Sequence, residues 1–169
     1  MTTSIRPAAV ALLLGLPLAA PVLAAESEAS FISRTGDEIG AATLTDTAHG
    51  VLINVLLRGL PPNQWVALHI HEGSECDPKA EFKSAGGHYN PTNAEHGYFS
   101  ENGPHAGDLP NQYVNIDGSL HAEAIAPMVT LEAENPIKGK TLVIHASKDD
   151  YKSQPAGNAG PRIACAVIQ

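Results

Sequence analysis

The chain has 169 residues, of which 43% are hydrophobic and 17% charged, and its formal net charge at pH 7 is -8. An acidic balance of this size disfavours nucleic acid and anionic lipid as partners, so we expect neither. No uninterrupted apolar run reaches the ~20 residues that a membrane-spanning helix needs, which predicts no membrane span. These bounds favour one small globular domain.

The first residues predict a cleaved secretory signal. Arg6 precedes an apolar stretch over residues 8–18, and the small residues Ala24 and Ala25 come before the first acidic residue. This is the layout of an export signal. We therefore expect cleavage after residue 24, within a residue or two, and a single mature domain over residues 25–169.

The alternative for this segment is an N-terminal core helix, which its three prolines disfavour: these are Pro7, Pro17 and Pro21. Removal of Arg6, the one charged residue of the signal, leaves 9 basic and 18 acidic residues and a net charge of -9.

From about Ser30 the chain reads as short strands of β-branched and apolar residues separated by turn residues. Two hairpin-like breaks, Thr35-Gly36-Asp37 and Asp117-Gly118, illustrate the pattern. The predicted strands cover residues 30–34, 38–46, 49–57, 65–72, 112–117, 120–127, 140–147 and 162–168.

The long segments 72–109 and 148–160 have no periodicity, and loops of such length in a compact domain are generally functional or disordered. No amphipathic helix is evident. We therefore predict an all-β protein, an eight-stranded antiparallel Greek-key β-sandwich or flattened barrel with two long functional loops, although strand pattern alone does not fix the connections.

The first long loop holds three histidines and a carboxylate in the pattern H-x7-H-x8-H-x2-D, formed by His88, His96, His105 and Asp108. Three nitrogens and one oxygen are a donor set that a closed tetrahedral zinc site uses. A metal is the economical reason to place these residues on a segment without periodicity of its own.

A second group of histidines lies on predicted strands. Because strand side chains alternate between faces, His69 and His71 project from the same side of strand 65–72. By the same argument His145 faces away from Leu142 and Ile144. These three, with one loop histidine, predict a cluster that prefers copper.

A lone histidine is more often an ordinary surface or hydrogen-bonded residue. We assign His49 and His121, which fit neither cluster, to that class. The chain has two cysteines, Cys76 and Cys165, and an even number in an exported protein favours one disulfide over two unpaired thiols.

Six segments, in this order and spacing, resemble a copper/zinc superoxide dismutase of the bacterial periplasmic kind: ALHIHE, SAGGHYNP, AEH, GPHAGDLPN, KTLVIHASKDD and GNAGPRIACAVI. The resemblance covers essentially the whole mature chain. Its most specific parts are the spacing from His88 to Asp108 and the GNAGPRIAC run, whereas HIH alone is weakly specific.

The resemblance implies one copper and one zinc cation per subunit, with one histidine shared. The implied copper ligands are His69, His71, His88 and His145. The implied zinc ligands are His88, His96, His105 and Asp108. A histidine bridges two metals by losing both ring protons, which flanking cations make favourable.

The resemblance also assigns roles around the metals. Asp149 matches an aspartate that links ligands of the two metals, and Arg162 matches an active-site arginine that docks a small anion. Cys76 and Cys165 match an intrachain disulfide. Lys148 and Lys152 are weaker candidates for steering the substrate, since exposed loop lysines usually only interact with solvent.

The implied activity is dismutation of superoxide to oxygen and hydrogen peroxide by alternate reduction and oxidation of copper, with His88 and Arg162 as catalytic residues and the bacterial periplasm as the compartment. A copper- or zinc-buffering protein without turnover is the alternative; it needs no anion-docking arginine. A purely structural β-sandwich leaves the ligand spacing unexplained. The sequence leaves a monomer and a homodimer both open.

Overall fold

The computed structural model describes residues 24–169, so the predicted signal, apart from Ala24, lies outside the described residues. The described part is built from β-strands and contains one short 3-10 helix, η1 (Lys83–Ala85). The strands are β1 (Glu26–Ser33), β2 (Glu38–Thr47), β3 (Gly50–Leu57), β4 (Gln64–Val66), β5 (Leu68–His71), β6 (Gln112–Val114), β7 (Leu120–Ala126), β8 (Thr141–His145) and β9 (Arg162–Val167).

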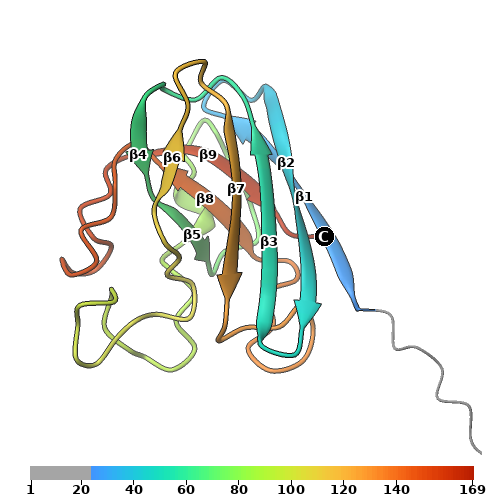
Figure 1. The fold of residues 1–169 in the computed structure, drawn as a ribbon, viewed down its shortest axis with the longest axis vertical. Coiled ribbons are helices and arrows are strands. Elements are labelled where there is room, and N and C mark those ends of the chain that lie inside the picture. Colours follow the sequence, from blue (N-terminus) through green and yellow to red (C-terminus); the bar gives the residue numbers. More distant parts are fainter. Residues whose placement is uncertain (1–23) are drawn as a thin grey trace, which may run out of the picture.

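The strands form an antiparallel, barrel-like arrangement. Seven of them make one sheet in the order β5-β8-β9-β1-β2-β3-β7, and β4 pairs with β6 in a second, small sheet. In Figure 1, β6 lies beside β7, and strands β8 and β9 pass behind β3 and β7. The connection from β7 to β8 joins strands that β9, β1, β2 and β3 separate in the larger sheet, as a Greek-key crossover does.

The single strand predicted over residues 65–72 is two strands, so nine strands replace the predicted eight. The break falls at Ala67, whose N–H donates to the carbonyl of Ser147 at 2.9 Å and whose carbonyl accepts from the N–H of His145 at 2.9 Å. β4 pairs with β6 before this point and β5 pairs with β8 after it. The chain thus passes at Ala67 from the small sheet to the seven-stranded sheet.

The main core lies between the inward faces of the strands. β3 alternates with period two: Val51, Ile53, Val55 and Leu57 are buried, while Leu52 and Leu56 are exposed. Removing one such aliphatic side chain from water contributes about 1.5–3 kcal/mol. The core therefore fixes the register of β3, because a slip by one residue would expose this whole set.

A second, smaller core lies under the loop that follows β5. Phe82 and Ala85 pack there against Val143 of β8 and Cys165 of β9. A disulfide between Cys76 and Cys165, with Cα atoms 5.7 Å apart, links the loop covalently to β9. The bond implied by the resemblance is therefore present, and it holds residues 72–87 against the sheet.

The two long loops lie on the same side of the barrel (Figure 1) and contact each other. The Phe99 N–H donates to the Tyr151 carbonyl at 3.0 Å, and the Asn111 N–H donates to the Tyr151 hydroxyl at 2.7 Å. Among residues 24–169, no helix has the length and apolar character to cross a membrane.

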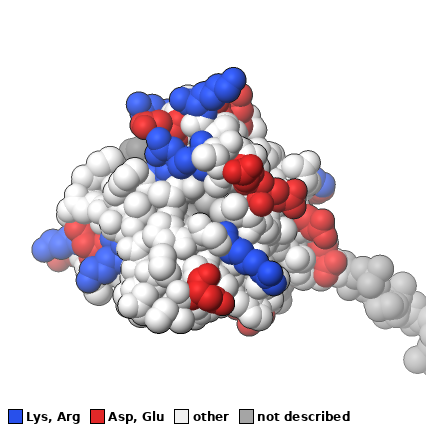
Figure 2. Space-filling view, turned by 90° about the horizontal axis from the view of Figure 1, so that it is seen from above, with Lys and Arg blue, Asp and Glu red and all other residues white. Residues whose placement is uncertain are grey.

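Figure 2 shows Lys and Arg side chains in several separate groups, with Asp and Glu nearby and a broad area free of these four residue types. Elsewhere in the described chain, exposed charges pair: Arg34 Nη2 lies 2.7 Å from Glu81 Oε1, and Lys138 Nζ lies 2.8 Å from Glu132 Oε1. Exposed pairs of this kind contribute little to stability. This face carries no continuous basic surface.

Candidate metal centre

β5 supplies the first two histidines of the centre. Its residues Leu68 and Ile70 point into the main core, so the alternation of strand side chains directs His69 and His71 to the opposite face. All four residues are buried. The predicted facing of this strand is confirmed.

The first long loop packs along the free edge of β5 like an additional strand. The Ile70 N–H donates to the Gly107 carbonyl at 2.9 Å, and the Ile70 carbonyl accepts from the Tyr89 N–H at 2.8 Å. A Cβ on Gly107 would lie 2.2 Å from the Ile70 carbonyl oxygen, so this approach requires glycine. The same contacts bring His88 and Asp108 beside the β5 histidines.

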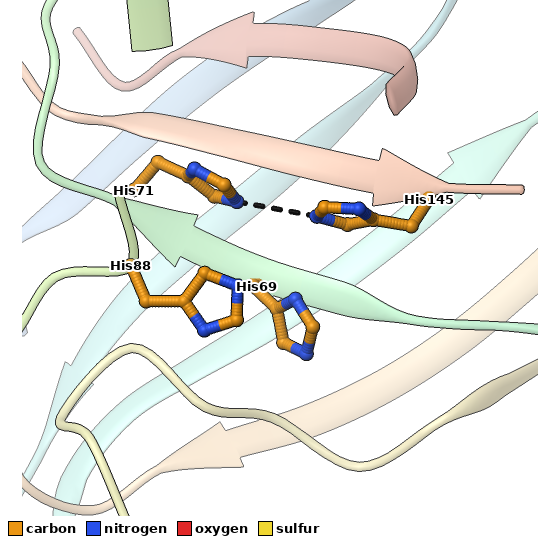
Figure 3. A group of neighbouring side chains, drawn as sticks. All are labelled: His69, His71, His88 and His145. Atoms are coloured by element: carbon orange, nitrogen blue, oxygen red, sulfur yellow. Dashed lines mark hydrogen bonds between the residues drawn. The ribbon is translucent and has the colours of Figure 1, made fainter. Parts of the chain in front are cut away.

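Four imidazoles surround one small space (Figure 3). Each contributes one ring nitrogen to a group whose atoms all lie within 4.8 Å of one another. The Nε2 atoms of His71 and His145 are 3.3 Å apart. The cluster consists of His69, His71, His88 and His145.

Backbone carbonyls orient two of these rings. His71 Nδ1 lies 3.0 Å from the Gly86 carbonyl oxygen and His145 Nδ1 lies 3.1 Å from that of Gly160. Because a carbonyl only accepts, each Nδ1 is the protonated nitrogen. Each neutral ring therefore directs an Nε2 lone pair into the cluster.

The second cluster is centred on one carboxylate oxygen. Asp108 Oδ1 lies 2.8 Å from His88 Nδ1, 3.0 Å from His96 Nδ1 and 3.3 Å from His105 Nδ1. The other oxygen, Oδ2, accepts from the N–H groups of Gly97 and His105 at 2.9 and 3.0 Å. These two bonds fix the carboxylate so that Oδ1 faces the three rings.

Several buried atoms in these clusters lack a hydrogen-bond partner within the described chain. They are His69 Nδ1, His88 Nε2 and His105 Nδ1. The last lies within ion-pair distance of Asp108 without the geometry of a hydrogen bond. An unsatisfied buried polar atom costs about 1–3 kcal/mol. A metal cation at each cluster would satisfy these nitrogens, so the residues fit a pair of metal sites.

Asp149 connects the two clusters. Its Oδ2 lies 2.9 Å from His69 Nε2 and its Oδ1 lies 3.0 Å from His96 Nε2. The carboxylate can only accept from these rings when ionised, so His69 has Nδ1 free for the first cluster. All three side chains are buried.

The protonation states suit metal binding. Burial lowers the pKa of His88 to about 4 and that of His145 to about 3, and it also holds the pKa of His71 well below its usual value. Burial opposes ionisation of Asp108, but its contacts with His105, His88 and His96 outweigh burial and lower the pKa of this carboxyl. Neutral imidazoles and an ionised carboxylate are the forms that bind metals.

His96 differs from the other rings. Burial works against its protonation, yet hydrogen bonds to Asp108 and Asp149 outweigh burial and raise the pKa of His96 to about 9. Two carboxylates therefore face one ring. This arrangement favours positive charge between His96 and Asp108, as a proton or as a metal cation.

Arg162 begins β9 and pairs in register with His145. Its guanidinium is partly buried and donates to the carbonyls of Phe82 and Gly86. Gly86 is also the residue whose carbonyl orients His71. One turn of the η1 loop thus fixes both the arginine and a histidine of the first cluster.

The remaining candidates lie outside the centre. His49, His121, Lys148 and Lys152 are all exposed, and neither cluster includes His49 or His121. Sequence reasoning missed Asn111 and Gln154, whose side chains bond the backbones of Asp149 and His96. Amides that bind distant backbone groups leave no spacing pattern that a single sequence would reveal.

The fold and the two adjoining clusters define a β-barrel protein built to hold two metals side by side. Residues 38–168 match the sequence profile described as copper/zinc superoxide dismutase (SODC). A relative from Aquifex aeolicus named superoxide dismutase [Cu-Zn] 2 is 49% identical over 149 residues, covering 85% of this chain and 86% of the relative. A superoxide dismutase [Cu-Zn] from Caulobacter vibrioides is 40% identical and covers 79% of this chain and 80% of its own.

Solved structures agree with these sequences. A superoxide dismutase-like protein from Bacillus subtilis superposes with a TM-score of 0.79 at 34% identity, over 84% of this chain and 97% of that one. The Cu/Zn superoxide dismutase from Brucella abortus gives a TM-score of 0.70 at 28% identity, over 86% and 100%. The chain belongs to the copper/zinc superoxide dismutase family. It is an oxidoreductase whose metals are copper and zinc.

Proposed function

We propose that the protein converts two superoxide anions and two protons to oxygen and hydrogen peroxide. The observation that carries this proposal is the position of His88, which belongs to both clusters. Its Nδ1 faces Asp108 in the second cluster, and its buried Nε2 is unpartnered beside the first. A single imidazole in this position would be a ligand of both a redox metal and a second cation.

The first cluster is the proposed copper site. His71, His88 and His145 would bind through Nε2, and His69 would bind through Nδ1 because Asp149 occupies its Nε2. When bound, copper supplies one-electron chemistry by alternate reduction and oxidation. The four imidazoles suit copper better than a hard cation such as magnesium.

The second cluster is the proposed zinc site. The Nδ1 atoms of three histidines and Oδ1 of Asp108 make a set of four donors, with no fifth member among the described residues. Such a closed set is typical of structural zinc. Its role here would be to order the loop and, as a cation beside His88, to favour loss of the Nε2 proton so that this nitrogen can bind copper.

His88 would also move a proton. In one half of the cycle Nε2 takes up a proton while Nδ1 stays in the second cluster, and in the other half Nε2 releases that proton toward the reduced product. Asp149 would hold His69 and His96 in place through both halves.

Arg162 is the proposed docking residue for superoxide. It carries a permanent positive charge, pairs in register with His145, and is held by two backbone carbonyls. A small anion beside this guanidinium lies next to the copper cluster. A metal-buffering protein has no need of this residue.

We also propose that the protein is exported, with the bacterial periplasm as its compartment. Two features support this: the signal-like residues 1–24 and the Cys76–Cys165 disulfide. Disulfides persist in oxidising compartments and are rare in the cytosol. Separation of the periplasmic fraction, with a cytosolic enzyme as the control, would test this assignment.

The function is tested by metal analysis of the purified mature protein together with a superoxide consumption assay before and after chelation. We expect about one copper and one zinc per chain. Turnover should be lost on chelation and should return with both metals. Full metal content without turnover would contradict the enzyme proposal and favour the buffering alternative.

A further inference from the structure

His96 lies in the loop between η1 and β6, outside every strand, although its ring is fully buried. Its backbone N–H donates to Oε1 of Gln154 at 2.9 Å, and its carbonyl accepts from Nε2 of the same side chain at 2.9 Å. Within residues 24–169, the His96 peptide groups have no other hydrogen-bond partners. Gln154 thus pairs with His96 as a neighbouring strand would.

Gly157 covers the ring of His96 from another side. Its φ is +64°, and a Cβ at this position would lie 1.8 Å from Asp149 Oδ1 and 2.7 Å from His96 Nε2. These are the two atoms that form the hydrogen bond between the clusters. Glycine is therefore required for the backbone to close over this bond.

The turn that carries both residues is itself held firmly. The Gly157 N–H donates to the Ser153 carbonyl at 2.7 Å, and the Asp150 N–H donates to the Gly157 carbonyl at 2.9 Å. The Asp150 carboxylate accepts from the Ser153 N–H at 2.8 Å. Gln154 and Gly157 therefore occupy fixed positions relative to Asp149.

The position of His96 matters because both of its ring nitrogens are engaged. Nδ1 faces Asp108 at 3.0 Å and Nε2 faces Asp149 at 3.0 Å. A displacement or rotation of the ring therefore disturbs the distance or the angle of both contacts. Hydrogen bonds weaken steeply once distance and angle leave their narrow range.

We propose that Gln154 and Gly157 are positioning residues that set His96 against Asp149, and that through Asp149 they couple the second cluster to His69 in the first. The inference rests on the proposed assignment of zinc to the second cluster. Residues that orient a metal ligand from outside typically change metal affinity by about 10–100-fold when they are removed.

The test measures zinc affinity by competition with a chelator and records the visible spectrum of cobalt(II) placed in the second cluster of the full mature chain. Gln154→Ala removes both bonds to the His96 backbone, so we expect zinc affinity to fall about 10-fold or more and the cobalt spectrum to shift. Gln154→Glu keeps the acceptor for the His96 N–H and loses the donor, so its loss should be intermediate. Gly157→Ala should have the largest effect.

The matched control is Ser153→Ala. Its hydroxyl donates to Asp150 Oδ2 at 2.6 Å and contacts neither cluster, so the variant should keep wild-type affinity and spectrum. Asp149→Asn shows how far zinc affinity falls when the carboxylate that contacts both His69 and His96 is itself removed. If Gly157→Ala fails to fold, Gln154→Ala still decides the question.

Wild-type zinc affinity and an unchanged cobalt spectrum in Gln154→Ala, alongside a loss in Asp149→Asn, would overturn the inference. Wild-type zinc affinity and an unchanged cobalt spectrum in Asp149→Asn would also overturn the inference, because Asp149 would then not couple the two clusters. Neither readout requires turnover. A wild-type protein that binds zinc but does not consume superoxide therefore contradicts the proposed function and leaves the positioning test intact.

Discussion

At the scale of single residues, the chemistry depends on which nitrogen of each histidine is free. In the first cluster, the outer nitrogen of three rings is held by a group that cannot donate: a carbonyl for His71 and His145, and the Asp149 carboxylate for His69. This leaves the inner nitrogen unprotonated without any proton transfer on binding. His88 is the exception because both of its nitrogens face a cluster.

His88→Ala should therefore weaken both metals together, whereas His105→Ala should weaken mainly zinc. Removing one of four ligands from each cluster breaks two sites with a single substitution. Copper and zinc affinities measured separately on the two variants would check this. Unaltered binding of both metals by His88→Ala would contradict the shared position.

The metal-free protein should lose stability on acidification. The pKa values of His88 and His145 in the folded chain, about 4 and about 3, lie below the ordinary value of 6.5, so the unfolded chain binds protons first. The free energy of unfolding should therefore fall as pH drops from about 6.5 to about 4, at up to ~1.4 kcal/mol per pH unit for each group.

His96 has the opposite sign, because its raised pKa, about 9, adds stability that is present below 6.5 and is lost as pH rises through 9. Urea midpoints of the metal-free protein across this range would test both trends. A His145→Gln variant should show a shallower decline on the acid side. A midpoint that does not change between about pH 6.5 and about pH 4 would contradict the prediction.

At the scale of elements, two long loops complete the centre that begins on β5 and β8, because strands and one disulfide hold these loops in place. The first is fixed by the edge of β5 and by the disulfide, and the second follows β8 and leads into β9. Phe82, buried beneath the first loop, packs against Cys165 and Val143. The loops are therefore as well positioned as the strands that they join.

Replacing the disulfide with the pair Cys76→Ser and Cys165→Ala should lower the free energy of unfolding by about 4–5 kcal/mol. The bond closes a segment with a sequence separation of 89 residues, and the unfolded chain gains entropy without it. Turnover should also fall, because the carbonyls that hold Arg162 lie in the released loop. Urea unfolding and superoxide assays of the metal-loaded variant would measure both.

The strand positions and the grouping of histidines could be predicted because burial imposes a period of two and because metal ligands cluster. The break at Ala67 could not, since Val66, Leu68 and Ile70 all face the core and continue one alternating pattern across it. The break depends on a pairing partner: β6 before it and β8 after it. Which strand each half pairs with depends on contacts between residues far apart in the sequence.

Contacts around the ligands were equally inaccessible to sequence reasoning. Gln154 binds a backbone 58 residues away and Asn111 one 38 residues away. The sequence around an Asn or Gln does not differ according to whether its side chain hydrogen-bonds to water or to a buried peptide group. The resemblance predicted the ligands and the role of Asp149, and only the folded chain brings these amides to His96 and Asp149.

At the scale of the whole molecule, an acidic protein is proposed to act on an anion. The local field decides this, since Arg162 and two bound cations would lie at the copper site while Asp and Glu are spread over the surface seen in Figure 2. Exposed charges separated by more than ~10 Å are largely screened at ordinary salt. Net charge therefore says little about substrate approach.

Lys148→Glu and Lys152→Glu test whether loop lysines contribute to this field. If they steer superoxide, each should lower kcat/KM and reduce its dependence on salt, with kcat unchanged. Lys138→Glu is the matched control, since it reverses a similarly exposed charge on the loop that precedes β8. Equal kcat/KM in all three variants and the wild type would show that neither loop lysine steers.

The position of the first long loop on β5 has one further consequence. β5 is an end strand of the seven-stranded sheet, and the N–H and carbonyl of Ile70 are satisfied by Gly107 and Tyr89 of that loop. An uncovered strand edge is a template for pairing with other chains. We therefore expect the loop that carries His88 and Asp108 also to shield this edge from pairing with other chains.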